Sequence, residues 1–259
     1  MELLKASYIN TTTSIVVGSN TATAEYLMNP DTSFQYVTSG FNNDLTTASI
    51  RINFTETMSV SRIALCGINL KEFDVFYNGA TANAFAMTTT ASTTTSKWTS
   101  NSETSIYIQC TLVDCTSVTI DMKKTMVANK EKALGYLAVS RVALDFTKIP
   151  SAKNYTPLID TQEVIHRLSD GNTRSQVIAD RWKVNVRLDY VTEAFRNNLK
   201  AVYNLHEGLI FVPFGTTTSW DQVIFPCVWL GPFDFYKFSD NAPAAGFEGN
   251  IKLEETTPA

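Results

Sequence analysis

Three observations predict a mainly β protein of two domains with one helix. Residues 1–145 hold many short apolar runs, rich in Thr and separated by loops of Asn, Ser and Gly, which is typical of an all-β sandwich. Residues 182–190 alternate strictly between apolar and polar side chains, the pattern of a strand buried on one side. Residues from about 192 to 206 show the spacing of an amphipathic helix. Because 259 residues are more than one small core needs, we expect two domains.

The boundary between the two domains is expected at residues 146–157. This segment holds two prolines and no hydrophobic period, which is typical of a linker. We therefore predict a first domain over residues 1–145, a linker over 146–157 and a second domain over 158–259.

The first domain is predicted as a succession of short strands. Turn residues close several of the apolar runs, as at residues 29–31 (Asn-Pro-Asp) and 78–79 (Asn-Gly). The expected strands or strand-like segments lie, in order, at residues 15–17, 26–28, 49–54, 60–65, 73–77, 106–108, 118–120 and 135–144.

Residues 81–105 interrupt this succession, because they are rich in Thr and Ser and show no period. We expect an exposed loop with an edge strand there. The alternative is the rim of a ligand site, in which the ring of Trp98 is a stacking platform.

The second domain is predicted to begin with a hairpin, because an Asp-Gly pair at residues 170–171 separates two β-like runs. After the strand at 182–190, Thr192 caps the helix, and Glu193 lies in its first turn, where a negative charge suits the helix dipole. The helix is expected to end near Gly208, since a residue with positive φ often ends a helix. Further strands are expected at residues 209–214, 221–230 and 247–253, with an aromatic-rich segment at 233–238.

The strand at residues 182–190 has two different faces. Its apolar face, which we expect to be buried, consists of Trp182, Val184, Val186, Leu188 and Tyr190. Its polar face consists of Lys183, Asn185, Arg187 and Asp189. In a monomer the polar face meets water, whereas in a ring it lines the lumen or pairs with a neighbour. These four polar residues are therefore the candidate subunit interface.

Composition argues against several classes of protein. A net charge of −4 and an isoelectric point near 5.3 disfavour a nucleic-acid or anionic-membrane surface. No stretch approaches the roughly 20 apolar residues of a membrane span, and the first ten residues lack the apolar run of a signal peptide. The four cysteines match no zinc spacing, so we expect buried free thiols at Cys66 and Cys227 in a chain made in a reducing compartment.

The sequence shows no constellation of catalytic or metal-binding residues. His206-Glu207 begins like a zinc-protease motif, but Ile210 stands where the second histidine ligand is needed. We expect structural roles for His166 and His206, with no catalytic residue, no metal and no cofactor, and hence no enzyme activity. A glycan-active enzyme is disfavoured because no paired carboxylates are recognisable.

Two groups of charged residues leave alternatives open. The carboxylates of Asp31, Asp44 and Asp74 are candidates to assist a calcium ion in the first domain, although no loop has the regular acidic spacing of a dedicated site. Lysines cluster at residues 121–132, which we expect to be a solvated loop. The alternative for this cluster is contact with an acidic neighbouring subunit.

Several segments of the first half together resemble discoidin-type, galactose-binding-like jelly-roll domains. The resemblance covers about half the chain and rests on residues 26–31 (YLMNPD), 48–54 (ASIRINF), 60–70 (VSRIALCGINL), 73–77 (FDVFY) and 134–139 (LGYLAV). It implies a jelly-roll β-sandwich for residues 1–145. The family often has Trp at the turn where this chain has Phe34 or Tyr36, so these two residues, with Trp98, are the candidate glycan contacts.

The second half is similar to ring-forming proteins of tailed-phage tails, in particular distal tail or baseplate hub proteins. A hairpin, an amphipathic strand and one helix are followed by residues 209–214 (LIFVPF), 228–233 (VWLGPF) and 246–255 (GFEGNIKLEE). The resemblance implies a β-sandwich or barrel with a flanking helix, which stacks as a ring at the end of the tail tube. Such proteins often carry an outer domain of galactose-binding type, so the two resemblances support each other.

The expected fold is therefore an N-terminal jelly-roll β-sandwich followed by a β-sandwich or barrel domain with one flanking α-helix. The expected function is structural: a homo-oligomeric ring, by resemblance a hexamer, at the distal end of the tail tube, in contact with tube, hub and fibre proteins. Such a chain is made in the cytoplasm of the bacterial host and resides in the virion tail. The alternative is a carbohydrate-binding module that attaches to a host-surface glycan. Neither reading involves nucleic-acid sequence recognition or membrane insertion.

Overall fold

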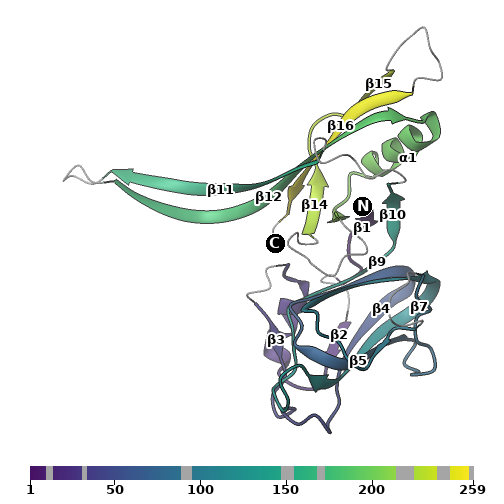
Figure 1. Ribbon diagram of the computed structural model, residues 1–259, viewed down its shortest axis with the longest axis vertical. Helices are drawn as coiled ribbons and strands as arrows, with labels where there is room; N and C mark the ends of the chain where they lie inside the picture. Colours follow the sequence, from purple (N-terminus) through teal and green to yellow (C-terminus); the bar gives the residue numbers. More distant parts are fainter. Residues whose placement is uncertain are drawn as a thin grey trace. The chain divides into compact units, whose positions relative to one another are not determined.

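The computed structural model describes residues 1–9, 14–30, 34–88, 95–146, 155–167, 173–213, 225–237 and 246–256. These residues form two compact units (Figure 1). Met1–Ala143 make up most of the first unit, and Leu144–Phe211 with Phe225–Thr256 make up the second. The prediction of a mainly β fold is confirmed, since antiparallel strands form both units and the described residues contain one α-helix.

The first unit is a β-sandwich whose larger sheet has the order β2-β4-β7-β5-β6, with β9 pairing with β4; β3 and β8 form a separate pair. In Figure 1, β4, β5 and β7 lie next to one another as long curved strands. The elements are β1 (Glu2–Lys5), β2 (Ser14–Val17), the 3-10 helix η1 (Thr21–Met28), β3 (Tyr36–Val37), β4 (Ala48–Cys66), β5 (Leu70–Tyr77), β6 (Lys97–Trp98), β7 (Ser105–Thr125), β8 (Ala133–Leu134), β9 (Tyr136–Ser140) and β10 (Val142–Asp145).

The two longest strands of this unit each join segments that the sequence predicted separately. β4, of 19 residues, contains residues 49–54 and 60–65, and β7, of 21 residues, contains 106–108 and 118–120. The pairing of β4 with β7 shifts register between Asn53 and Met58 and again between Val60 and Arg62. Such bulges bend a strand and interrupt its alternation without ending it, so periodicity alone divides each long strand into two short ones.

Inward-facing residues of β4, β5 and β7 form the apolar core of the first unit. Ile52, Phe73 and Ile120 are completely buried there. The ring of Trp98 lies flat on the ring of Phe73, with centroids 4.7 Å apart and an interplanar angle of 10°. Full burial of a side chain of this kind contributes roughly 1.5–3 kcal/mol, so this layer accounts for much of the unit's stability.

The second unit contains an antiparallel sheet with the order β13-β14-β16-β12-β11, and β15 pairs with β16. Its elements are β11 (Tyr155–Arg167), β12 (Thr173–Val191), α1 (Glu193–Tyr203), β13 (Leu209–Val212), β14 (Phe225–Trp229), β15 (Asp234–Lys237) and β16 (Phe247–Glu255). Residues 155–157, predicted to belong to the linker, are the first residues of β11, where they pair with β12. The remaining predicted linker residues, apart from Phe146, lie outside the described ranges.

The helix α1 begins as the sequence predicts but ends earlier. The side chain of Thr192 accepts a hydrogen bond from the amide of Phe195 at 3.2 Å, which caps the first turn. Leu199 and Val202 are buried. The helix ends at Tyr203, and the residue with positive φ is His206 at 51°, not Gly208. In the described part of the chain, no helix is long and apolar enough to cross a membrane.

The predicted faces of β12 are confirmed for its central residues. Val184, Val186 and Leu188 are buried, and Val186 pairs with Ile251 of β16. Tyr190 corrects the prediction, because it is 58% exposed with a φ of 57°. It lies in a bulge where the pairing with β16 passes from Leu188 directly to Val191, so its side chain leaves the buried face.

Candidate functional site

β11 and β12 form a long antiparallel hairpin in the second unit. The two strands pair from Tyr155 opposite Val186 to Arg167 opposite Thr173. The pairing of β16 with β12 covers only Lys183–Val191. Among the described residues, the hairpin beyond Lys183 is therefore a ribbon of two strands with no third strand beside it (Figure 1).

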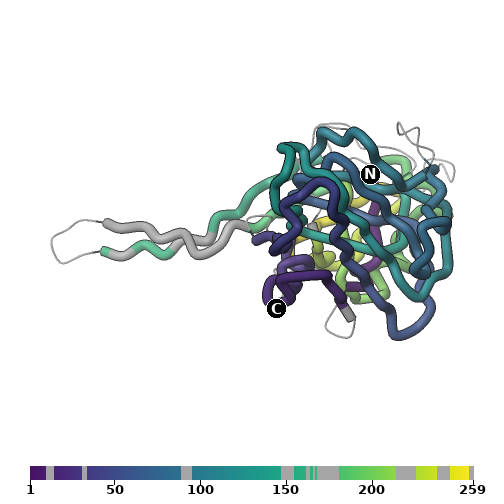
Figure 2. Tube along the Cα trace, turned by 90° about the horizontal axis from the view of Figure 1, so that it is seen from below, coloured from purple at the N-terminus to yellow at the C-terminus, as the bar shows by residue number. Residues whose placement is uncertain are grey.

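We define the ribbon as residues 158–167 of β11 and 173–182 of β12. At about 3.3 Å per residue, its ten residues on each strand span roughly 30 Å. The two strands run side by side in Figure 1, as their pairing requires, and Figure 2 shows the chain from below. The predicted turn at residues 168–172 lies outside the described residues.

The ribbon exposes apolar side chains. Leu158 is 57% exposed, Ile159 50%, Val164 38% and Ile165 58%. Because neighbouring residues of a strand point to opposite faces, both faces of the ribbon carry exposed aliphatic groups. A two-stranded hairpin is marginally stable in water by itself, and its open edges offer unpaired backbone groups to another chain. The ribbon is thus a candidate assembly surface, which the sequence analysis treated as an ordinary hairpin.

The four residues of the predicted polar face make ion pairs within the chain or face solvent. The Lys183 ammonium lies 2.7 Å from an Asp160 carboxylate oxygen and 3.7 Å from Glu254. The hydrogen bond to Asp160 raises the pKa of Lys183. Arg187 bonds Asp189 at 2.9 Å and Glu248 at 3.4 Å. Asn185 is exposed. Strand register places these charges outside the core, and their role as a subunit interface stays a prediction.

Two of the three candidate glycan contacts are not available at the surface. Trp98 is 9% exposed and stacks on Phe73, because β6 pairs with β5 at these two residues. Tyr36 is completely buried, and its hydroxyl donates a hydrogen bond to the Ser19 carbonyl at 2.8 Å. The prediction of a Trp98 stacking platform was therefore wrong. Residues 89–94 of the predicted rim lie outside the described ranges.

Phe34 is the exception among these candidates. Its side chain is 46% exposed, and its ring centroid lies 5.6 Å from that of Tyr26 with a tilt of 53°. The pair places two aromatic rings together, one of them open to solvent. A contact between Phe34 and a glycan stays a prediction.

The lysine cluster at residues 121–132 includes a cation that is not solvated. Lys132 is completely buried, and its ammonium donates hydrogen bonds to the carbonyls of Phe41 at 2.6 Å and Asn43 at 3.3 Å. Burial lowers the pKa of Lys132, while the charges of Asp44 and Glu131 act in the opposite direction. The expectation of a solvated loop was therefore wrong for this residue, whose ammonium connects strand and loop.

The acidic side chains around this lysine are occupied by donors from the protein. Glu131 accepts from the Thr38 hydroxyl at 2.6 Å and the Gly40 amide at 2.9 Å; the hydrogen bond from Thr38 is the main cause of its lowered pKa. Asp44 accepts from the amide and hydroxyl of Thr125, both at 3.2 Å. These contacts hold the loop at residues 38–46 against the end of β7 and the segment that follows it.

The other two calcium candidates are accounted for separately. Asp74 pairs with the Lys123 ammonium at 2.7 Å. Asp31 lies outside the described residues. Within the described ranges, no three His, Cys, Asp or Glu side chains are grouped so as to hold a metal ion.

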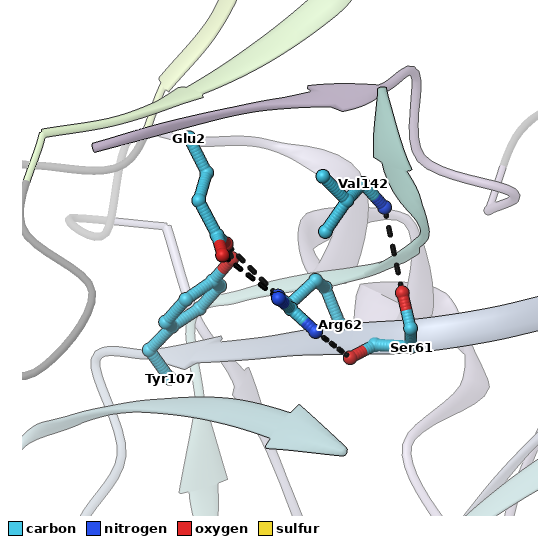
Figure 3. Close-up of polar contacts among 5 residues, drawn as sticks. All are labelled: Glu2, Ser61, Arg62, Tyr107 and Val142. Carbon is cyan, nitrogen blue, oxygen red and sulfur yellow. Dashed lines mark hydrogen bonds and ion pairs between the residues drawn. The ribbon is translucent and has the colours of Figure 1, made fainter. Parts of the chain in front are cut away.

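A second buried charge cluster joins β1, β4 and β7 (Figure 3). The Arg62 guanidinium donates to both carboxylate oxygens of Glu2, at 2.9 and 2.8 Å, and the Tyr107 hydroxyl donates to the same carboxylate. Burial alone would raise the pKa of Glu2, but the hydrogen bonds from Arg62 and Tyr107 outweigh it and lower the pKa. Burial raises the pKa of Tyr107. The carboxylate is ionised and fully hydrogen-bonded, so it acts as a structural tie.

The cysteines are also poorly suited to chemistry. All four are free and buried, which confirms the prediction for Cys66 and Cys227. Burial raises the pKa of Cys66 and of Cys110 to about 12 and that of Cys115 to about 11. Thiols with such pKa values stay protonated near neutral pH and are weak nucleophiles. His206 is exposed after α1, and the side chain of His166 lies outside what the structure describes.

Comparison with known proteins gives only distant similarities. No protein-family model and no curated protein sequence matches the chain. Among solved structures, it is similar to a labelled mutant of chitosan-binding module 1 from a Paenibacillus sp. IK-5 chitosanase/glucanase, at 11% identity and a TM-score of 0.41 over 52% of this chain and 98% of that one. It is also similar to the family 32 carbohydrate-binding module of Clostridium perfringens NanJ in complex with galactose, at 13% identity and a TM-score of 0.38 over 54% and 99%.

A third neighbour is chitosan-binding module 2 of the Paenibacillus enzyme in complex with chitotriose, at 17% identity and a TM-score of 0.36 over 49% of this chain and 95% of that one. All three neighbours are carbohydrate-binding modules. With TM-scores below 0.5, these similarities establish no common function. None of the three is a tail protein, so the tail-tip reading also stays a prediction.

Proposed function

We propose that this chain is a structural protein that assembles with copies of itself, and that the ribbon of β11 and β12 is the arm that holds neighbouring copies together. The observation that supports this proposal is the ribbon itself. It runs about ten residues past the last pairing with β16, and it exposes aliphatic side chains on both faces.

Energetics favour a covered ribbon. Each exposed Leu, Ile or Val on it leaves about half of its apolar surface in water, so covering that half contributes roughly 1 kcal/mol per side chain. A monomer also gains no hydrogen bonds from the open ribbon edges, whereas a neighbouring strand would satisfy them. A second copy of this chain is the simplest partner, since a repeated head-to-tail contact between identical subunits forms a ring when its rotation closes.

The finer form of the proposal is a ring at the distal end of a phage tail tube, with a hexamer as the expected state. In that setting the second unit forms the ring and the first unit is the side domain that it presents. The partners are tube, hub and fibre proteins, the location is the virion tail, and no catalysis is involved. This form is based on the sequence resemblance of the second half to tail-hub proteins.

The deciding experiment shortens the ribbon without disturbing the rest of the sheet. Asp160 pairs with Arg181, so replacing residues 161–180 by Asn-Gly closes a two-residue hairpin at that pair. Light scattering and negative-stain images should show rings for the natural protein and folded monomers for the shortened one. Equal assembly of both proteins, or a natural protein that is monomeric at high concentration, would contradict the proposal.

A matched pair of point substitutions serves as control. Ile165→Ser changes a ribbon residue that is 58% exposed, and Leu112→Ser changes a first-unit residue that is 59% exposed. Both remove similar apolar surface from similar exposure. Only Ile165→Ser should weaken assembly, and equal weakening by both would show that general surface hydrophobicity drives association.

The second candidate function is glycan binding by the first unit, favoured by the surface pair of Phe34 and Tyr26. Exposed aromatic rings stack on the apolar faces of sugars. Galactose and chitotriose, the sugars present in two of the neighbouring structures, are suitable probes. This candidate expects saturable binding that Phe34→Ala abolishes and Leu112→Ala leaves intact. No binding of either sugar by the natural protein would count against it.

A further inference from the structure

The second unit contains a small pocket with aromatic and acidic walls, apart from the ribbon. It has a volume of about 140 Å³ and lies where the end of α1 meets β13 and β14. Its apolar part includes the buried side chains of Val202 and Leu209. Its other walls include Tyr203, His206 and Trp229, and Glu207 stands at its exposed rim.

Three of these walls are aromatic rings at steep angles to one another. The Tyr203 ring lies 5.4 Å from the Trp229 ring at 74°, and 5.5 Å from the His206 ring at 66°. In each pair the edge of one ring points at the face of the other, and all three residues line the pocket. The electron-rich faces of Trp and Tyr attract cations within about 6 Å of the ring centre.

His206 has a left-handed backbone conformation at the end of α1. With a φ of 51°, His206 occupies the left-handed region that glycine adopts without strain. Its amide bonds the Tyr203 carbonyl at 3.2 Å, which closes the end of α1. This helix end therefore also places an imidazole in the wall of the pocket.

The charge at the pocket has one sign. No lining residue is Lys or Arg, and the exposed carboxylate of Glu207 has no ion-pair partner among the residues that the structure describes. A carboxylate at the mouth of the pocket attracts cations and repels anions. Aromatic walls with a single acidic rim are the combination that recognises alkylated ammonium groups.

We propose that this pocket binds an organic ammonium cation, with the charged head against the wall formed by Tyr203, Trp229 and His206 and with Glu207 as its counter-ion. A compact head with one charge fits an apolar space of this size better than a sugar ring with many hydroxyls. Two sources supply this chemistry: a quaternary ammonium compound and the side-chain amine of a lysine. The inference does not rest on the assembly proposal, because none of the pocket residues belongs to the ribbon of β11 and β12.

The test is an NMR titration of the full chain with three small probes, two of which share one shape. Choline carries the quaternary charge, 3,3-dimethylbutan-1-ol is its neutral isostere, and n-butylamine represents a lysine side chain. Choline or n-butylamine should bind about tenfold more tightly than the neutral isostere, the share expected from cation–π and ion-pair attraction. The tighter of the two cations identifies the source. Equal binding of choline and its neutral isostere, or no saturable shift with either cation, would overturn the proposal.

Variants test the named residues without relying on a single fold-sensitive change. Glu207→Gln should weaken cation binding about threefold, and Glu193→Gln, which removes the same charge from an exposed site at the other end of α1, should not. His206→Gly relieves the backbone and removes the ring, so it should keep or raise the melting temperature while weakening binding. If His206→Gly is stable and binds choline like the natural protein, the ring is not part of the site and the proposal fails. Trp229→Leu should abolish binding, provided that its melting temperature shows a folded protein.

Discussion

β4 and β12 are both 19 residues long, yet one is built into a core and the other becomes an exposed arm. β4 has β7 on one side and β2 and β9 on the other, so its ends are each covered by a third strand. β12 has β16 beside it only from Lys183 onward. Strand length therefore does not decide exposure. The reach of the neighbouring strand decides it, and it divides β12 into a half that pairs with β16 and a half that pairs only with β11 among the described residues.

The largest loss of stability is expected from a substitution in the core beside β4. Phe73→Ala removes the ring on which Trp98 stacks and leaves a cavity in a fully buried layer. The first unit should lose about 3–5 kcal/mol of unfolding free energy. Denaturant titration followed by Trp fluorescence measures this loss. A loss below 1 kcal/mol would show that this layer is loosely packed.

The next effect concerns the loop held by Lys132. Lys132→Met leaves the carbonyls of Phe41 and Asn43 without their donor in a buried position, so we expect a loss of about 2–4 kcal/mol. Lys130→Met is the matched control, because Lys130 is exposed in the same segment and should cost no more than about 0.5 kcal/mol. Equal losses for the two variants in thermal unfolding would mean that the buried ammonium has no structural role.

A smaller effect tests the half of β12 that β16 covers. Val186→Ala should cost the second unit roughly 1–3 kcal/mol, because Val186 is completely buried opposite Ile251. Arg187→Glu should cost the folded subunit less than Val186→Ala does, since Arg187 is exposed and water screens its ion pairs with Asp189 and Glu248.

Arg187→Glu also tests the predicted subunit interface on this strand. If the polar face of β12 contacts a neighbour, the charge reversal should give a folded subunit that no longer assembles, as seen by light scattering. Normal ring formation by Arg187→Glu would remove this face from the interface and leave the ribbon as the contact.

The smallest effect is expected from acid. Lowering the pH should reduce the unfolding free energy of the first unit through three carboxylates that the second unit does not contain. Hydrogen bonds lower the pKa of Glu2, of Asp44 and of Glu131 below the usual values of 4.5 for Glu and 3.8 for Asp, and in Glu2 and Asp44 they outweigh burial. At a pH between the folded and the unfolded pKa values of these groups, the folded first unit therefore binds fewer protons than the unfolded chain does. Its stability from these groups is complete above about pH 4.5 and is lost as the pH falls through the folded pKa values.

Melting temperatures measured from pH 7 to pH 2 check this acid sensitivity. The Asp44→Asn, Glu131→Gln double variant should begin less stable and lose less on acidification, because two of the titrating carboxylates are gone. An acid profile as steep as that of the natural protein would assign the effect to other groups.

Predictions from the sequence succeeded where the cause lies in neighbouring residues. The alternation from Lys183 to Leu188 settled which side chains face the core, since period two has one solution when one face is buried. The cap at Thr192 was equally local. The end of α1 was not, because Gly208 suits a helix stop but His206 adopts the positive φ first.

Predictions failed where partners distant in the chain decide the outcome. Trp98 lies in a polar, Thr-rich stretch, and only its pairing with Phe73 in β5 makes it a core residue. Lys132 belongs to a hydrophilic run, and only the carbonyls of residues 41 and 43 make its burial tolerable. Glu2 and Arg62 are 60 residues apart, so no local pattern indicates their ion pair.

By itself, the sequence determined that this protein is mainly β, that one amphipathic helix follows a strand with one buried face, and which residues of that strand are inside. These features follow from the 2.0 and 3.6 residue periods, which act within a few residues. Only the tertiary structure decided that β12 continues as a two-stranded arm beyond β16, that Trp98 is buried, and that three aromatic rings meet beside Glu207. These depend on where a third strand stops and on which distant segments touch, because burial is set by what covers a residue and not by its neighbours in the chain.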